Sequence, residues 1–223
     1  MRAEFGRQLR ELEEALLDMG SLCQQAISYA GTVLMKNDEK LRGQVLSLET
    51  EIDKQDRRIE NLCTSMLLRQ SPVARDLRFV SASLRLVSDM ERIGDQAADI
   101  AELSAYITEK PLLGKLHLSA ICCVVSGMVT DSIAAMVKQD LELARQVIRE
   151  DDRADALFLQ IKEELVELIC ENKTDPQEIL DLLMAAKYFE RVGDHAVNIA
   201  EWVEYYITGE HCGKMTAVSS MNA

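Results

Sequence analysis

The sequence predicts an all-α protein built from two tandem copies of a three-helix unit. Its 223 residues are 48% hydrophobic but only 4% aromatic, and they include 10 Gly and 3 Pro, a profile typical of long helices packed through aliphatic side chains. An unbroken apolar seam marks the first helix, and a twelve-residue segment that begins at residue 91 recurs 99 residues later. The chain is long enough to bury a substantial core.

The first helix and the start of the second are the clearest elements. Apolar side chains from Phe5 to Val33 alternate spacings of four and three residues without a break, which indicates one continuous amphipathic helix. Asn37 and Asp38 then predict a turn and a helix N-cap. A second apolar stripe follows and stops at Gln70.

Each of the three prolines is expected to mark the start of a helix, because a missing N–H group costs nothing in the first turn. Pro72, with Ser71 as the capping residue, opens the third helix, Pro111 opens the fourth, and Pro176 opens the sixth. The third to sixth helices are expected over about 72–108, 112–138, 140–172 and 176–209. The expected organisation is a first three-helix unit over 1–110, a second over 111–208, and a loose tail over 209–223.

The repeat links the two halves. Residues 91–102 read ERIGDQAADIAE and residues 190–201 read ERVGDHAVNIAE, with eight of twelve positions identical. The same offset matches Leu84 to Leu183 upstream. Because each copy closes a unit with short connections, the sequence predicts two antiparallel three-helix bundles that lie end to end or side by side.

Charge and composition argue against several function classes. A net charge of −13 repels phosphate backbones, so we expect no nucleic-acid binding, and it suits cations or basic partner surfaces. No apolar run reaches the roughly 20 residues of a transmembrane segment, and the N-terminus is too charged for a signal peptide. Without a CxxC pair, the six cysteines are expected to be reduced core thiols of a cytosolic protein rather than a zinc site. They are Cys23, Cys63, Cys122, Cys123, Cys170 and Cys212.

Carboxylates occupy positions that packing would otherwise fill. Glu91 falls within an apolar stripe of the third helix, and Asp95 lies within about 40° of it around the helix axis. Glu190 and Asp194 repeat the arrangement in the sixth helix. Carboxylates beside an apolar face must find a positive partner or take up protons.

The preceding helix of each half supplies a second pair of acids at the same i, i+4 spacing. Glu49 and Asp53 form this pair in the first half, and Asp151 and Asp155 form it in the second. Four carboxylates brought together would suit hard or intermediate cations such as magnesium, manganese, calcium or iron. A solvated acidic stripe is the alternative interpretation.

Other conspicuous residues have structural interpretations. Gly94 and Gly193 interrupt their helices beside the acids and would allow close approach of a neighbouring helix. His195 lies about 100° from the acid face, which favours a structural or interfacial role. Neither repeat contains the Glu-x-x-His pair of di-iron bundles. Arg75 and Arg78 could meet an anion, but a surface position is the simpler interpretation.

The doubled motif, together with the segment PVARDLR at 72–78, resembles the signature of the PhoU family, the phosphate-signalling accessory proteins of bacterial phosphate ABC transporters. The resemblance covers about residues 1–208. It implies multinuclear clusters of divalent or ferric metal ions (iron, manganese, magnesium or zinc) on E(D)-xxx-D motifs. Because Asn198 replaces Asp99, the second cluster should be less anionic. The implied ligands are Glu49, Asp53, Glu91, Asp95 and Asp99 in one half, and Asp151, Asp155, Glu190, Asp194 and Asn198 in the other.

The resemblance also implies a function. The protein would be a non-catalytic regulator of phosphate homeostasis that negatively controls phosphate uptake and the phosphate-starvation response. Its implied partners are the transporter ATPase and a membrane sensor histidine kinase, and it would act as a cytoplasmic homodimer at the inner face of the membrane. The alternative is a metal-dependent enzyme, either a phosphoester hydrolase or an oxidase. Acid faces without interspersed bases, and two clusters expected far apart on an elongated frame, favour docking surfaces over one active site.

Overall fold

The computed structural model describes residues 2–70, 72–107, 113–114, 116–171 and 174–210. Over these residues the chain forms long helices and no strand, which confirms the all-α prediction. The helices are α1 (Arg2–Lys36), α2 (Glu39–Gln70), α3 (Ala74–Leu103), α5 (Leu118–Lys138), α6 (Leu141–Glu171) and α7 (Pro176–Thr208).

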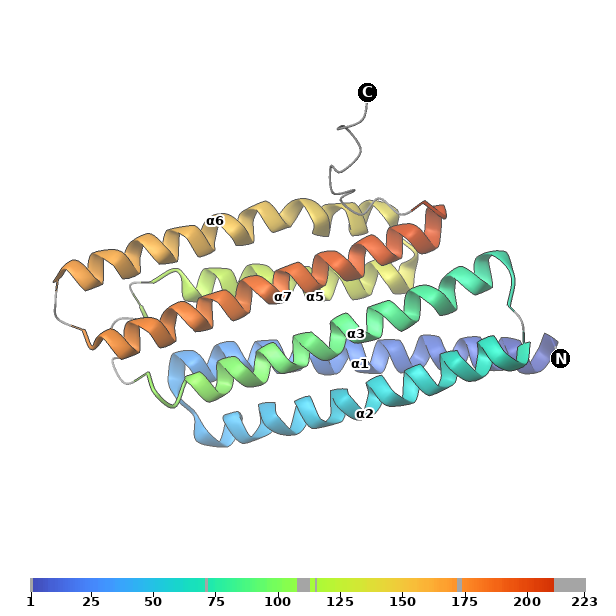
Figure 1. Cartoon of the computed structure of the whole chain (residues 1–223), viewed down its shortest axis with the longest axis horizontal. Coiled ribbons are helices and arrows are strands. Elements are labelled where there is room, and N and C mark those ends of the chain that lie inside the picture. The colour runs from blue at the N-terminus through green and yellow to red at the C-terminus, as the bar shows by residue number, and fades with distance from the viewer. Residues whose placement is uncertain (1, 71, 108–112, 115, 172–173, 211–223) are drawn as a thin grey trace, which may run out of the picture.

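The two three-helix units lie side by side rather than end to end. Figure 1 shows α2, α3, α7 and α6 next to one another in one layer, with α1 and α5 behind them. Across the boundary between the units, α3 contacts α7 and α1 contacts α5. Outer surfaces of both units therefore contribute to the same four-helix face.

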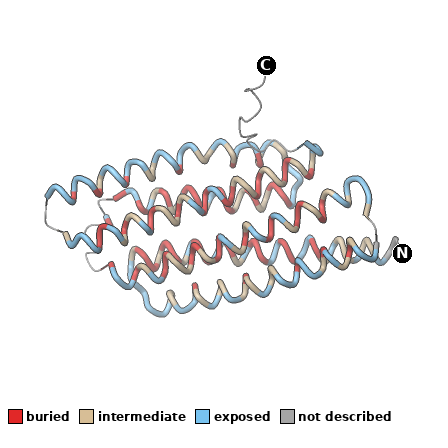
Figure 2. Tube along the Cα trace, viewed as in Figure 1, coloured by how far each residue is buried: buried red, intermediate tan, exposed pale blue. Residues whose placement is uncertain are grey.

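A single apolar core runs through both units. Buried residues follow the inner faces of the helices (Figure 2) and join one hydrophobic cluster that crosses from the first unit into the second. The seam predicted for the first helix is part of it, because Leu12, Leu16 and Met19 are fully buried. Each repeat therefore supports the packing of the other.

Two of the predicted helix starts are confirmed by hydrogen bonds. Asp38 Oδ1 accepts a hydrogen bond from the Leu41 amide at 3.1 Å at the start of α2. Asp175 Oδ1 accepts one from the Gln177 amide at 2.9 Å, with Pro176 in the first turn of α7. Both acids satisfy amide groups that have no partner inside the helix.

The start of α3 differs from the prediction. This helix begins at Ala74 with an extended Val73 as its N-cap, so Pro72 precedes it rather than opening it, and Ser71, the predicted cap, lies outside the described residues. The helix expected from about 112 begins at Leu118, and Leu116 is buried in the turn before it.

The third helix also ends before the predicted Thr108. Its last residue is Leu103, and the Arg42 guanidinium of α2 donates to the Ala101 carbonyl at 3.1 Å and to Ser104 Oγ at 3.3 Å. This arginine satisfies a carbonyl at the helix end, which favours termination there. The predicted unit boundary at 110–111, with Pro111, and the tail from 211 lie outside the described residues.

One helix, α5, is long and apolar enough to span a membrane by length and composition alone, which the sequence analysis did not anticipate. Half of its apolar window is buried inside the protein, where it contacts α1, α6 and α7. A Cβ atom at Gly31 of α1 would lie 2.3 Å from Cys122 Sγ of α5, so the two helices approach closely. We interpret α5 as a core helix that joins the two units.

The cysteines divide between core and surface. Cys23 and Cys63 are buried free thiols, as predicted, and burial raises the pKa of each to about 12. Cys122 is partly buried, whereas Cys123 and Cys170 are exposed free thiols, so the core prediction is wrong for these two. They fall on helix faces that no neighbouring helix covers. Cys212 lies outside the described residues.

Candidate metal centre

Three carboxylates from α2 and α3 meet at the surface of the first unit. One oxygen atom from each of Glu49, Asp53 and Asp95 lies within 4.8 Å of the others. Glu49 and Asp53 stand one turn apart on α2, and Asp95 comes from the adjacent α3. The structure thus brings together acids that the i, i+4 spacing had placed on facing helices.

Gly94 sets the spacing between α2 and α3 at this point. A Cβ atom at Gly94 would lie 3.0 Å from Ile52 Cδ1 and 3.2 Å from Ile52 Cγ2, and Ile52 is fully buried. Ile52 directly precedes Asp53, and Gly94 directly precedes Asp95. The apolar contact therefore controls how close the two acids come, which confirms the role predicted for Gly94.

Gly193 does not have the same role in the second unit. A Cβ atom there would lie 3.6 Å from Val125, 3.7 Å from Ala154 and 3.7 Å from Met128, which are ordinary van der Waals distances. The prediction of a close helix approach is therefore wrong for this glycine. Smaller or more distant neighbours leave room for a methyl group.

Burial and mutual repulsion disfavour the charged forms of the acids in the first unit. Burial raises the pKa of Glu49, and the negative charge of Asp53 raises it further. The pKa of Asp95 rises for the same two reasons. Asp53 has an ion pair with Arg57 at 3.5 Å, but the arginine side chain is 74% exposed, so the pair contributes little.

The remaining predicted ligands of the first unit lie beside these three residues, which we call the carboxylate triad. Burial and then the nearby Asp95 raise the pKa of Glu91, which also interacts electrostatically with Asp53. Burial and then Asp95 also raise the pKa of Asp99, which accepts a hydrogen bond from the Tyr188 hydroxyl of α7. Three convergent carboxylates, with further acids in reach, fit a hard or intermediate cation, whose charge would relieve the repulsion.

The acids predicted for the second unit do not converge in the same way. Among the residues that the structure describes, no second group of three carboxylates comes as close as the triad. Asp151, Asp194 and Asn198 line a groove of about 580 Å³ between α6 and α7, together with Arg191 and His195. Basic groups therefore lie among the acids here, contrary to the sequence-based expectation.

The other two predicted ligands of the second unit stand apart from this lining. Asp155 is exposed on α6. Glu190 forms an ion pair with Lys187, one turn earlier on α7. Neither residue belongs to the set of side chains that lines the groove.

Asn198 and His195 instead bind Asp89 of α3, a residue that the sequence analysis did not single out. Asn198 Nδ2 donates to Asp89 Oδ1 at 3.0 Å, and His195 Nδ1 lies 2.9 Å from the same oxygen. The His195 side chain is largely buried, so its predicted interfacial role is confirmed. No sequence pattern could have identified Asp89, because its partners lie more than a hundred residues away.

In the contact between α3 and α7, two pairs of residues at equivalent positions of the repeat face each other with the two helices exchanged. At the offset of the repeat, Tyr188 corresponds to Asp89, and Asp99 corresponds to Asn198. Tyr188 hydrogen-bonds Asp99 just as Asp89 bonds Asn198, as expected of repeats related by a two-fold axis. Both groups of acids therefore border the same α3–α7 contact, and the prediction of two clusters far apart on an elongated frame is wrong.

The two arginines that could have met an anion contact the second unit instead. Arg75 hydrogen-bonds Gln139 and stacks on the Tyr206 ring with its Cζ 5.6 Å from the centroid. Arg78 Nε donates to the Tyr206 carbonyl at 3.4 Å. Both side chains therefore fasten the start of α3 to the end of α7.

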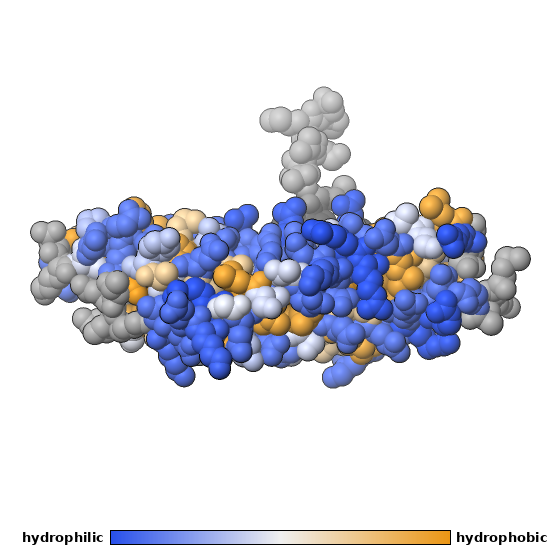
Figure 3. Space-filling view, turned by 90° about the horizontal axis from the view of Figure 1, so that it is seen from below, coloured by the Kyte–Doolittle hydropathy of each residue, from blue (hydrophilic) through white to orange (hydrophobic). Residues whose placement is uncertain are grey.

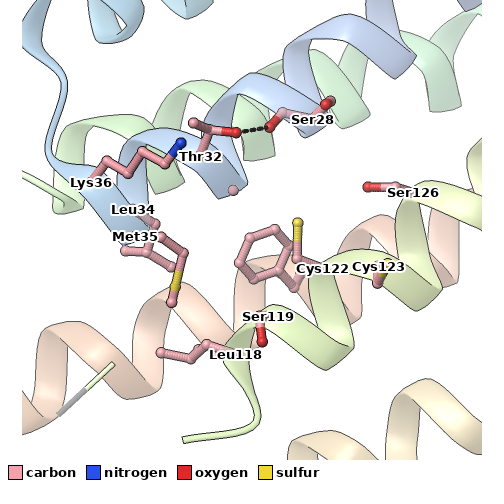
Figure 4. Close-up of a pocket in the computed structure, with 12 residues that line it drawn as sticks. Ser28, Thr32, Leu34, Met35, Lys36, Leu118, Ser119, Cys122, Cys123 and Ser126 are labelled. Atoms are coloured by element: carbon pink, nitrogen blue, oxygen red, sulfur yellow. Dashed lines mark hydrogen bonds between the residues drawn. The ribbon is translucent and has the colours of Figure 1, made fainter. Parts of the chain in front are cut away.

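Another groove, of about 380 Å³, lies between α1 and α5 (Figure 4). Its lining combines apolar side chains with the hydroxyl groups of Ser28, Thr32 and Ser126, and with Lys36 at one end. No carboxylate contributes to this lining, so the groove does not suit a hard cation.

The comparison with known proteins agrees with this architecture. The PhoU domain matches the chain twice, at residues 16–104 and 118–203. The chain belongs to the PhoU domain family. Each match falls within one three-helix unit, which is what the two halves of the doubled motif predict.

Relatives and solved structures match almost the whole chain. A "Phosphate-specific transport system accessory protein PhoU homolog" from Deinococcus radiodurans is 34% identical over 210 residues, covering 94% of this chain and 99% of the relative. A homolog of the same name from Clostridium acetobutylicum is 33% identical, with 94% and 96% covered. The crystal structure of PhoU from Pseudomonas aeruginosa superposes with a TM-score of 0.84 at 30% identity, covering 92% of this chain and 100% of that one. PhoU from Streptococcus pneumoniae gives 0.83 at 25% identity, covering 93% and 98%.

Proposed function

We propose that this protein is an accessory regulator of a phosphate-specific transport system. It restrains phosphate uptake and the phosphate-starvation response when phosphate is plentiful. The matches over both units support this role, because the similar proteins bear names of that system. The protein acts on the cytoplasmic side of the membrane, as a homodimer, through contacts with the transporter ATPase and a sensor histidine kinase.

The observation that carries the proposal is the carboxylate triad on the four-helix face. Glu49, Asp53 and Asp95 hold a divalent or ferric ion, which neutralises their charge and fixes α2 against α3. The ion makes the face a rigid docking surface for a basic partner. Net charge of −13 adds attraction over a longer range, so association weakens as salt is raised.

The exposed surface along α2 favours docking through polar groups rather than through a large apolar patch. This edge, at the bottom of Figure 1, is mainly hydrophilic in Figure 3, with small separate apolar patches. Sedimentation of the protein alone would detect a homodimer. Sedimentation of a mixture with the ATPase, at low and at high salt, would detect the proposed complex.

The enzyme alternative receives less support from the geometry. A metal-dependent hydrolase needs an accessible base or acid next to its metal ligands. His195 lies close enough to Asp95 of the carboxylate triad to interact with it electrostatically, and it also lines the groove between α6 and α7. Its side chain is largely buried, and Nδ1 is held by Asp89. We therefore favour the regulatory role.

The test is deletion of the gene in the native host and growth with excess phosphate. We expect starvation genes to be derepressed or phosphate uptake to become toxic, and wild-type protein to restore control. Glu49→Ala with Asp95→Ala should fail to restore it. Glu14→Ala with Asp18→Ala is the control matched in charge, because it removes one glutamate and one aspartate from the exposed surface of α1. Normal repression in the deletion strain would overturn the proposal.

A further inference from the structure

We propose that Lys187 is a tethered cation that takes the place of a metal ion in the second unit, so that metal binds only to the first. The inference deepens the proposed function and rests on its assignment of a metal ion to the carboxylate triad. It assigns to one lysine the difference between two units that share the same acidic motif.

The ion pair of Lys187 satisfies the acid that repeats Glu91. Lys187 Nζ contacts Glu190 Oε2, one turn further along α7. The Glu190 side chain is only 12% exposed, whereas that of Lys187 is 42% exposed. A mostly buried carboxylate thus has a positive partner on its own helix, which remains in place whatever the metal supply.

An aromatic ring on the neighbouring helix holds this ammonium group. Lys187 Nζ lies 5.3 Å from the centroid of the Phe158 ring of α6, within the range of a cation–π interaction. Lys162 Nζ lies 5.9 Å from the same centroid. Two positive charges therefore gather around one ring between α6 and α7, close to the acids that would have to bind a metal.

The corresponding place in the first unit has the opposite charge. At the offset of the repeat, Lys187 corresponds to Ser88. The glycines of the motif touch Ile52 in one unit and Ala154 in the other, and this equivalence aligns α2 with α6. Phe158 and Lys162 then correspond to Asp56 and Glu60. Across these three positions, the first unit has two acids and a serine where the second has two lysines and a phenylalanine.

The consequences for a divalent cation differ between the units. In the first, one oxygen atom from each of Glu49, Asp53 and Asp95 lies within 4.8 Å of the others, and an incoming cation relieves their repulsion. In the second, the cation must displace an ammonium group from Glu190 and meet Lys162 nearby. In addition, Asn198 directs its amide N–H to Asp89. The second unit therefore keeps the shape of the motif while Glu190, its mostly buried acid, already has a positive partner.

The experiment measures bound manganese, by elemental analysis after dialysis against Mn²⁺ and then buffer. Introduced into the otherwise wild-type protein, Glu49→Ala with Asp95→Ala should reduce bound manganese to the level of the buffer blank. Adding Lys187→Ser to this double variant should restore bound manganese, and adding Asp194→Ala as well should remove it again. Lys162→Ser is the matched control, because it removes a charge from the same ring without freeing a paired acid, and it should restore nothing.

Folding is checked by circular dichroism for every variant. If Lys187→Ser does not fold, Lys187→Met replaces it, because the thioether chain keeps the apolar contact with Phe158. Manganese that survives Glu49→Ala with Asp95→Ala and disappears on adding Asp194→Ala would overturn the inference. Failure of both Lys187 variants to gain manganese would also overturn it. Wild-type protein without any manganese would count against the proposed metal-dependent docking, while the Lys187 variants would still decide the inference.

Discussion

Replacing either motif glycine by alanine tests how closely α2 approaches α3 at the metal centre. In both cases a methyl group is added to the middle of a helix, which by itself stabilises the helix by about 1 kcal/mol. At Gly193 the new Cβ atom would have neighbours at 3.6–3.7 Å, so this gain should be kept. At Gly94 it would lie 3.0 Å from Ile52 Cδ1, and Ile52 cannot move away because it is fully buried. Overpacking costs about 1–3 kcal/mol, so Gly94→Ala should lose roughly 0–2 kcal/mol net.

Thermal unfolding followed by circular dichroism measures this difference. For a chain of this size each kcal/mol shifts Tm by about 2–4 °C, so Gly94→Ala should melt below the wild type and Gly193→Ala above it. Gly94→Ala should also weaken manganese binding, because it separates Asp53 from Asp95, whereas Gly193→Ala should not. Ile52→Val removes the nearest methyl group and should recover part of both losses. Equal Tm and equal manganese affinity for the two alanine variants would refute the reasoning.

Three further predictions concern protons, the α3–α7 contact and the thiols. Because the pKa values of Glu49 and Asp95 are raised, the folded metal-free protein keeps protons that the unfolded chain releases, so its stability to urea should increase as pH falls from neutral. Glu49→Gln with Asp95→Asn should flatten this increase, and an unchanged pH profile would contradict it. Asn198→Asp replaces the amide that donates to Asp89 with a second negative charge, and it should lower the free energy of unfolding by about 1–3 kcal/mol. An unchanged free energy of unfolding in urea would contradict this prediction. In the native protein an alkylating reagent should modify the exposed Cys123 quickly and Cys23 only on unfolding, as peptide mass spectrometry would show; equal rates would argue against the burial.

The sequence alone determined the helices and the repeat. Apolar spacing along a helix depends only on the geometry of that helix, so the seam through Leu12 and Leu16 was readable without knowledge of its partners. Helix starts are equally local, which is why the cap at Asp38 and the helix start at Pro176 were identified correctly. The i, i+4 spacing of acids likewise indicated which face of α2 and α3 they occupy, although it did not show that Asp95 rather than Glu91 would join Glu49 and Asp53.

Only the tertiary structure decided what those acidic faces meet. The orientation of α7 relative to α3 depends on packing between residues about a hundred positions apart. This orientation places Asn198 within hydrogen-bonding distance of Asp89, and Tyr188 within hydrogen-bonding distance of Asp99. Likewise, the motif around Glu190 is nearly identical to its first copy, but here Glu190 is paired with Lys187, whose ammonium group lies against the ring of Phe158 on another helix. A repeat in sequence fixes which side chains recur, whereas burial and the charges contributed by neighbouring helices determine whether the recurring acids are free to bind a cation.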